Sequence, residues 1–185
     1  MKRILPFKAV RYNKNIVGDL GAVLCPPYDV VSEKQQQKLY ANHPFNIIRL
    51  EYGVANEEDS ETDNKYTRSA DTLNEWMYSG VLLPEKQPAI YVYGQDFEID
   101  GKQYSHNGII CLVRLEDFEK GNILPHKETL SKAKTDRLEL MMTCGANFSP
   151  VYSLYNDEDK KVSELVEDAV NQQPEISVKT DDGVC

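Results

Sequence analysis

The chain has 185 residues, of which 41% are hydrophobic and 28% charged, and its formal net charge is −9. This length is enough for one compact domain with a core, and the acidic balance argues against a non-specific nucleic-acid binder, which needs a broad basic face. No apolar run approaches the ~20 residues that cross a bilayer, and the N-terminus lacks a signal-peptide apolar segment, so we expect a cytoplasmic protein without membrane contact.

The first part of the chain predicts a strand followed by a stiff loop. Residues 4–12 alternate in the manner of a strand, and residues 25–31 (CPPYDVV) follow after a glycine-punctuated loop. Two adjacent prolines keep the backbone extended and cannot join a central ladder, so Asp29 is presented on a stiff segment. Asp29 could alternatively anchor the N-terminus of the helix that follows.

Two helices and a strand are expected next. Ser32 with Gln35 forms a capping box that opens a helix to about Ala41. Residues 45–52 (FNIIRLEY) alternate and predict a strand. Residues 66–78 carry apolar side chains at helical spacing, and Trp76 is expected in the core rather than at a ligand site.

The clearest local signal in the chain is a hairpin. Residues 89–97 and 103–115 are rich in strand formers and flank Asp100-Gly101, the preferred pair for a type I′ turn. Residues 109–113 are apolar without alternation, which predicts a central strand buried on both faces. His106 is expected to be structural or exposed rather than catalytic.

A cation-rich segment precedes the next helix, predicted over residues 133–144 with a stop at Gly145. Lys132, Lys134 and Arg137 lie in or beside its first turn, where the partial positive charge of the helix makes cations unfavourable. A bound anion would resolve this conflict, because phosphate suits both helix N-termini and basic side chains. Alternatively, these side chains are solvated or pair with the acidic remainder of the chain.

The C-terminal part predicts a strand or an extended segment over residues 147–155 and a polar helix within residues 157–173. The four cysteines show no metal-ligand spacing, so reduced thiols are expected and no metal site is. The elements together predict an α+β fold, a single compact domain with a mixed or antiparallel sheet and a few helices. We place this domain at residues 1–157 and a polar C-terminal helix and tail at residues 158–185.

Several motifs in colinear order resemble the bacterial domain-of-unknown-function family number 1015. They are PFKAVRYN (6–13), CPPYDVVSE (25–33), HPFNIIRLEYG (43–53), AIYVYGQDF (89–97), GIICLVRLEDFEKGNILPHKETLSKAKTDRLELM (108–141) and ANFSPVYSLY (146–155). The resemblance covers roughly residues 4–157. Members of that family are usually about twice this long, so the chain resembles their N-terminal half.

That family is itself similar to the ParB/sulfiredoxin superfold, which includes chromosome-partitioning CTPases, sulfiredoxins and a kinase that phosphorylates free serine. The likeness implies a basic phosphate-binding turn at a helix N-terminus, which would be residues 126–137 here, and an acidic base, for which Asp29 is the candidate. The superfold's usual phosphate-loop signatures, with Gly and adjacent His-Arg or Arg-Arg, do not occur in this sequence. This is a fold-level analogy and does not by itself establish chemistry.

The resemblance and the cation-rich segment together imply a nucleotide-binding protein that could be a phosphotransferase, such as a small-molecule kinase acting on a hydroxyl like that of free serine, or a nucleotide hydrolase. The cofactor would be ATP or ADP with Mg²⁺, and the partners a nucleotide and a small-molecule acceptor. The catalytic candidates are Asp29, His126 and Glu128, and the phosphate-binding candidates are Thr129, Ser131, Lys132, Lys134 and Arg137.

Other readings stay open at this point. The same pocket could serve a nucleotide-responsive regulatory module without catalysis. A ParB-like DNA association is disfavoured, because no helix-turn-helix with a basic recognition helix is recognisable. Residue by residue, His126 could cap a turn and Glu128 could pair with Lys132.

Overall fold

The computed structural model describes residues 3–125 and 131–179, and divides the chain into two compact units. The hairpin unit comprises Met1–Ala9, Pro84–Arg114 and Val151–Cys185, and the helical unit comprises Val10–Leu83 and Leu115–Pro150. The fold is α+β, as predicted, with short antiparallel pairings and six α-helices in the described residues. The strands form three two-stranded sheets in this part of the chain rather than one larger sheet.

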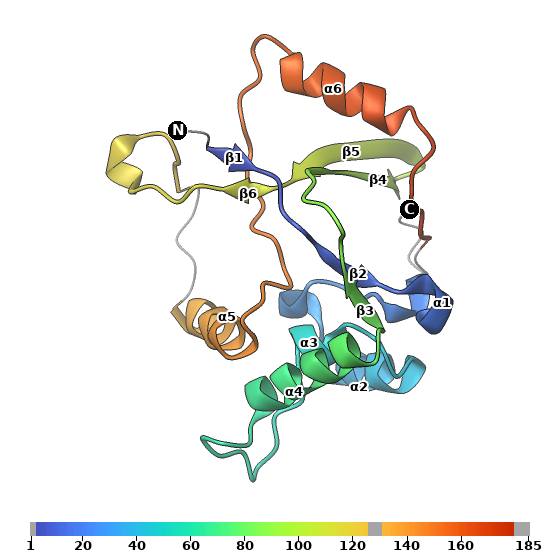
Figure 1. The fold of residues 1–185 in the computed structure, drawn as a ribbon, viewed down its shortest axis with the longest axis vertical. Coiled ribbons are helices and arrows are strands. Elements are labelled where there is room, and N and C mark those ends of the chain that lie inside the picture. Colours follow the sequence, from blue (N-terminus) through green and yellow to red (C-terminus); the bar gives the residue numbers. More distant parts are fainter. Residues whose placement is uncertain (1–2, 126–130, 180–185) are drawn as a thin grey trace. The chain divides into compact units, whose positions relative to one another are not determined.

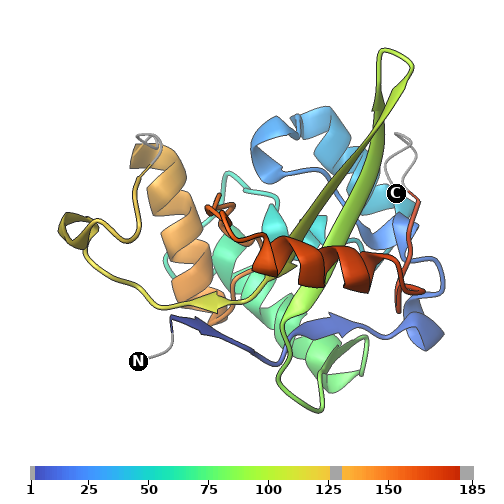
Figure 2. The ribbon, with the colours of Figure 1, turned by 90° about the horizontal axis from the view of Figure 1, so that it is seen from above.

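The hairpin unit is built on β4 (Tyr91–Ile99) and β5 (Lys102–Ile110), which pair antiparallel along their whole length. Asp100 and Gly101 have φ of 52° and 75°, as a type I′ turn requires, so the predicted hairpin is confirmed. Helix α6 (Lys161–Val170) packs across this hairpin (Figures 1 and 2). The C-terminal helix was thus also predicted correctly.

The second strand of the hairpin is not the buried central strand that the sequence predicted. The run breaks at Cys111, and β6 (Leu112–Val113) pairs instead with β1 (Ile4–Leu5). Leu112 and Val113 are each about half exposed. The apolar run is therefore divided between two partners, and no sheet of three or more strands covers both of its faces in the described residues.

The predicted first strand is also divided. Pro6 has no N–H to donate, and the chain after it forms an isolated bridge from Phe7 to Ala89 instead of a continuous strand. Pairing resumes in β2 (Val10–Tyr12), whose partner is β3 (Leu82–Pro84). Residues 4–12 are therefore extended, as predicted, but they form two short strands with a break between them and not one strand.

The helical unit begins with α1 (Lys14–Val17) and the short 3₁₀ turns η1 (Gly21–Val23) and η2 (Tyr28–Val30). Helix α2 (Glu33–Asn42) starts at the predicted capping box, in which Gln35 N–H donates to Ser32 Oγ and Ser32 N–H donates to Gln35 Oε1. Helices α3 (Ile48–Glu51), α4 (Lys65–Tyr78) and α5 (Ser131–Cys144) follow, with the 3₁₀ turn η3 (Phe118–Lys120) between the last two.

The predicted strand over residues 45–52 is wrong, because this segment turns into α3. Asn46 is fully buried, and its side-chain amide donates to the carbonyls of Ala22 and Leu24 at 2.9 and 2.8 Å. Its Oδ1 accepts from the N–H of Ile48 at 3.0 Å, which closes a local turn in place of a strand. The buried polar side chain, rather than the alternation of its neighbours, decides the conformation.

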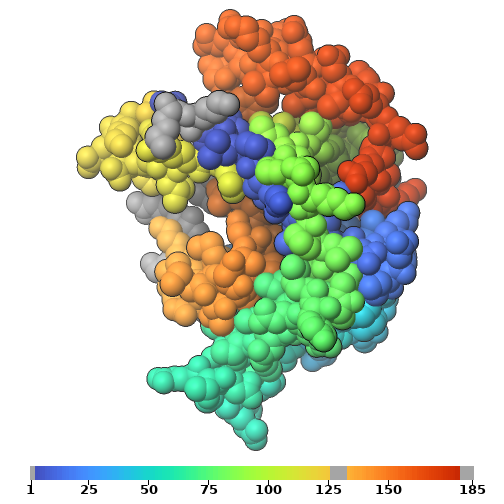
Figure 3. Space-filling view, viewed as in Figure 1, coloured from blue at the N-terminus to red at the C-terminus, as the bar shows by residue number. Residues whose placement is uncertain are grey.

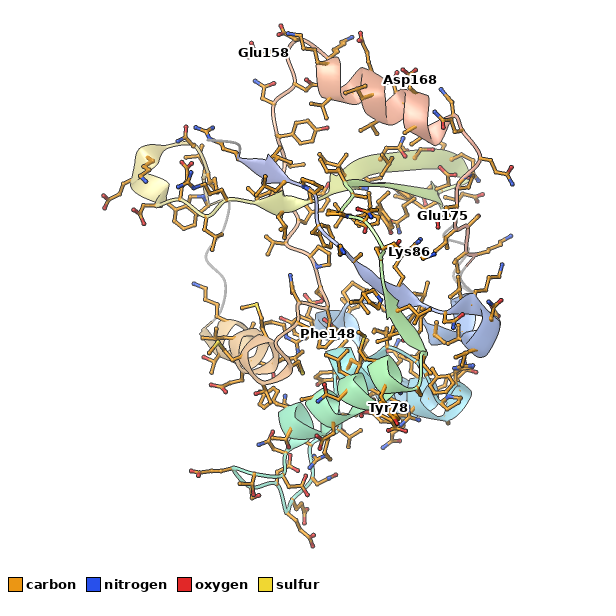
Figure 4. All side chains as sticks on the ribbon, viewed as in Figure 1. Tyr78, Lys86, Phe148, Glu158, Asp168 and Glu175 are labelled. Atoms are coloured by element: carbon orange, nitrogen blue, oxygen red, sulfur yellow. The ribbon has the colours of Figure 1, made fainter. Side chains whose placement is uncertain are left out.

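The core of the helical unit surrounds Trp76, which is 3% exposed and packs edge-on against Phe45 at 5.8 Å between ring centroids. Trp76 was therefore correctly assigned to the core. Phe148, on the segment that follows α5, also packs against this core (Figure 4). That segment carries no strand, so of the two alternatives for residues 147–155, a strand or an extended segment, the strand is not formed. Pro150 removes a donor in its middle, and the chain passes there from one unit to the other.

Candidate functional site at the second turn of α5

Helix α5 begins at Ser131, two residues before the predicted start, and packs against α4. Leu140 is its buried anchor, whereas Leu138, Met141 and Met142 are about half exposed or more. Gly145 ends the helix, as predicted, and its φ of 62° is the left-handed conformation common at helix ends. The earlier start brings Lys132 into the first turn together with Lys134, and this turn contains no acidic residue.

Arg137 lies at the centre of a network of charges in the helical unit. Its Nη1 donates to the backbone carbonyl of Glu51 at 2.9 Å and to Glu51 Oε1 at 3.0 Å. Its Nε and Nη2 donate to Asp136 Oδ2 at 3.0 and 2.5 Å. The guanidinium also stacks on Tyr28, 3.8 Å from the ring centroid. These contacts fix the orientation of α5 against α3 and η2.

Asp136 holds the network to α4. Its Oδ1 accepts from Lys65 Nζ at 2.5 Å and from Tyr66 Oη at 2.9 Å. Burial alone would raise the pKa of this carboxyl, but the hydrogen bonds from Lys65, Arg137 and Tyr66 outweigh it and lower the pKa from 3.8 to about 2. Asp136 is therefore ionised at neutral pH.

Glu51 is the most buried member, at 5% exposure. Burial raises its pKa, although the hydroxyl donated by Ser149 and the charge of Arg137 both favour the ionised form. The network thus contains two carboxylates and two cations, Lys65 and Arg137, and is close to neutral. An anion that recruited Arg137 would have to displace at least one of the two carboxylates.

The structure brings together only part of the predicted site. Asp29 is exposed on η2, and in the part of the chain that the structure describes its carboxylate has no partner. Because Tyr28 of the same turn stacks on Arg137, Asp29 is carried on a segment that contacts α5. Lys134 is exposed in the first turn of α5.

The remaining predicted residues belong to the segment that precedes α5 or to its first turn. His126, Glu128 and Thr129 lie outside the described residues. Ser131 and Lys132 lie in the first turn of α5, and their side chains are likewise outside the described part.

Sequence reasoning missed the residues that hold Arg137 in place. Glu51 fell in a predicted strand, and Lys65, Tyr66 and Ser149 carried no motif. Their partners are separated from them by 70 to 98 residues along the chain, so no local pattern could have paired them. In the part of the chain that the structure describes, no group of three metal-ligating side chains is placed to hold an ion.

Comparison with known families supports the motif-based resemblance. The model of the family described as protein of unknown function DUF1015 matches residues 4–185. The chain belongs to this family. The DUF1015 match extends beyond residue 157, where the motif resemblance ends, and so includes α6.

No curated protein and no solved structure is significantly similar to this DUF1015 member. In the described residues, no helix is both long and apolar enough to span a bilayer.

Proposed function

We propose that this protein binds the phosphates of a nucleotide, such as ATP or ADP, at the first turn of α5. The first N–H groups of a helix have no partners inside the helix itself, and this turn also carries the partial positive charge of a 14-residue helix. Lys134 adds an exposed positive charge, and no carboxylate in the turn competes with a bound phosphate. The ParB/sulfiredoxin likeness, with its phosphate turn at a helix N-terminus, supports the same location by analogy.

The observation that carries the proposal is the stack of Tyr28 on Arg137. It holds η2 against α5, and η2 carries the exposed carboxylate of Asp29. A helix turn that suits phosphate and an exposed carboxylate on a contacting segment are two of the parts that phosphoryl transfer uses. Arg137 then serves to position α5 and η2, because its donors already bind Glu51 and Asp136.

The proposed reaction is transfer of the terminal phosphoryl group to a hydroxyl, such as that of free serine. The hydroxyl oxygen attacks phosphorus, the bond from phosphorus to the leaving nucleotide oxygen breaks, and Asp29 accepts the hydroxyl proton. Mg²⁺ is typically held by one or two carboxylates together with substrate phosphates, and the exposed Asp29 fits that role as well. When bound, the ion would neutralise charge on the transferring phosphate.

A second function, nucleotide binding without turnover, is favoured by the network around Arg137. A cation already paired with two carboxylates is poorly placed to stabilise charge that develops in a transition state. Under this alternative, the nucleotide would change only the stability or the conformation of the helical unit.

A thermal-shift screen against ATP, ADP, CTP and GTP, each with and without Mg²⁺, tests the binding site. At about 100 times its Kd a ligand stabilises the folded state by about 2.7 kcal/mol, which raises Tm by roughly 5–10 °C for a chain of this size. Lys134→Ala should weaken binding about tenfold, the effect of losing about 1.4 kcal/mol. Lys38→Ala, which removes an exposed lysine on α2, is the matched control and should bind normally.

Phosphate transfer from the nucleotide that binds best distinguishes the two functions. With free serine and other hydroxyl compounds as acceptors, Asp29→Asn should retain binding and lose turnover if the protein is a kinase. Asp71→Asn, an exposed carboxylate on α4, is the control. No stabilisation by any nucleotide would refute the binding proposal, and full activity of Asp29→Asn would refute the role of Asp29.

A further inference from the structure

A second basic site lies in the helical unit, on the side of Lys65 that adjoins the loop between α3 and α4. There a hollow of about 230 Å³ is lined by Tyr40, Arg49, Asn56, Lys65, Arg68 and Thr72, among others. The loop that forms one wall projects from the helical unit (Figure 3). Three of the lining side chains, Arg49, Lys65 and Arg68, are cations.

The three cations differ in how their charges are balanced. Arg68 pairs with Asp59 at 2.7 Å and with Asp63 at 2.6 Å. Lys65 pairs with Asp136 at 2.5 Å. Arg49, by contrast, has no carboxylate partner in the described residues. A positive charge therefore remains at the wall of the hollow without a counter-ion from this part of the chain.

The hydrogen bonding of Arg49 is also incomplete. Its Nη2 donates to the backbone carbonyl of Tyr40 at 2.7 Å, and the guanidinium lies 4.4 Å from the centre of the Tyr40 ring. Its Nε is buried and has no acceptor among the described residues. Buried polar groups in native proteins are almost always paired, and an orphaned donor on a charged group calls for an explanation. An oxyanion that reached the guanidinium would supply both the missing acceptor and the missing charge.

Further donors surround the hollow. The hydroxyl of Tyr40 accepts from Val54 N–H at 3.2 Å, which leaves its own proton to donate. The ammonium of Lys65 has three protons, and Asp136 occupies one of them. The amide of Asn56 is exposed at the rim. Donors that converge from several directions suit a tetrahedral phosphate, with its four oxygens, better than a planar carboxylate.

The size of the hollow limits the ligand. Pockets for drug-sized molecules start at about 300 Å³, so a hollow of about 230 Å³ accepts a small anion but not a whole nucleotide. The position is also distinct from the first turn of α5, because the lining residues come from α2, α3, α4 and the loop between the last two.

We propose that this hollow binds inorganic phosphate or a small phosphomonoester through Arg49 and Lys65. Arg49 presents a planar fork of donors that matches the oxygens of phosphate, and Lys65 adds a second positive charge. The site does not depend on nucleotide binding at α5. Because Asp136 occupies one proton of the Lys65 ammonium, the bound anion would share this group with that carboxylate.

An NMR titration of the full chain with inorganic phosphate tests the proposal. The ¹H–¹⁵N spectrum reports the Nε–H of Arg49 directly, together with the amides of Val54 and Asn56. We expect these signals to shift saturably with phosphate and not with sodium chloride at the same ionic strength. Shifts that follow ionic strength alone, or acetate binding as tightly as phosphate, would overturn the proposal.

Variants locate the bound phosphate. Arg49→Lys keeps the charge but loses the planar fork, and should weaken phosphate binding at least tenfold. Asn56→Ala alters an exposed rim residue without disturbing the fold and should weaken binding severalfold, which keeps the test valid if the Arg49 variant does not fold. Lys38→Ala should bind as the wild type does. Wild-type affinity in both hollow variants, or loss of phosphate binding in Lys134→Ala, would place the anion elsewhere and refute the assignment.

Discussion

Replacing Asp136 by asparagine tests the network around Arg137 most directly. The substitution keeps the shape of the side chain and removes the charge that Lys65 and Arg137 share. The amide can still accept at one oxygen, but its NH₂ group would face a cation. We expect a folded protein of lower stability, because Lys65 and Arg137 would both lose a charged partner.

The magnitude follows from the pKa of Asp136. Lowering it from 3.8 to about 2 corresponds to about 2.4 kcal/mol at about 1.36 kcal/mol per pH unit. The side chain keeps 18% of its exposure, so solvent screens part of this energy and the expected loss at pH 7 is about 1–2 kcal/mol. Because the pKa is lower in the folded state than in the unfolded state, the contribution is complete above pH ~4 and is lost as the pH falls toward 2.

Urea unfolding of the wild type and Asp136→Asn between pH 7 and pH 3 measures this difference. The two proteins should differ by about 1–2 kcal/mol at pH 7 and by roughly half of that at pH 3. Burial raises the pKa of Glu51, so the contribution of this group to stability decreases as the pH rises. Glu51 is present in both proteins. Asp71→Asn should match the wild type. A difference below about 0.5 kcal/mol at pH 7, or one that does not narrow toward pH 3, would refute the network as a source of stability.

Three further predictions concern packing and burial. Asn46→Ala should lower the free energy of unfolding by about 3 kcal/mol or more in urea, because it orphans buried backbone groups; a loss under 1 kcal/mol would contradict this. Gly53→Ala should lower the free energy of unfolding by about 1–3 kcal/mol, because a Cβ there would lie 3.0 Å from the Lys65 carbonyl. Gly108→Ala is the control, because a Cβ at Gly108 would meet open space. Burial raises the pKa of Cys25 to about 12, so iodoacetamide at pH 8 should label Cys25 far more slowly in the folded chain than in urea; equal rates would exclude this burial.

Local signals in the sequence predicted local structure well. The capping box at Ser32 and the Asp100-Gly101 turn each depend on residues a few positions apart, and both are present as expected. The amphipathic spacing of α4 likewise placed Trp76 in the core. These predictions succeed because the deciding interactions lie within one turn of helix or one hairpin.

The wrong predictions arise where a residue that is distant in the sequence determines the local conformation. The alternation of residues 45–52 is overridden by Asn46, whose amide binds carbonyls more than 20 residues away. The apolar run at residues 109–113 predicted a buried strand, but exchange of partner at Cys111 leaves it half covered. For the candidate site, the cations of α5 were recognised from the sequence, whereas the carboxylate of Glu51 that holds Arg137 was not.

The sequence separation of the Arg137 network has a consequence for the order of folding. Its contacts join residues 70 to 109 positions apart, except for the pair of neighbours in α5. Loops of that length close late, after local helices and hairpins have formed, so these contacts should be weak or absent in the transition state. Substitutions at Glu51 or Asp136 should then accelerate unfolding and leave the refolding rate nearly unchanged, with φ-values near zero. The network would therefore slow the unfolding of the helical unit and have little effect on its folding rate.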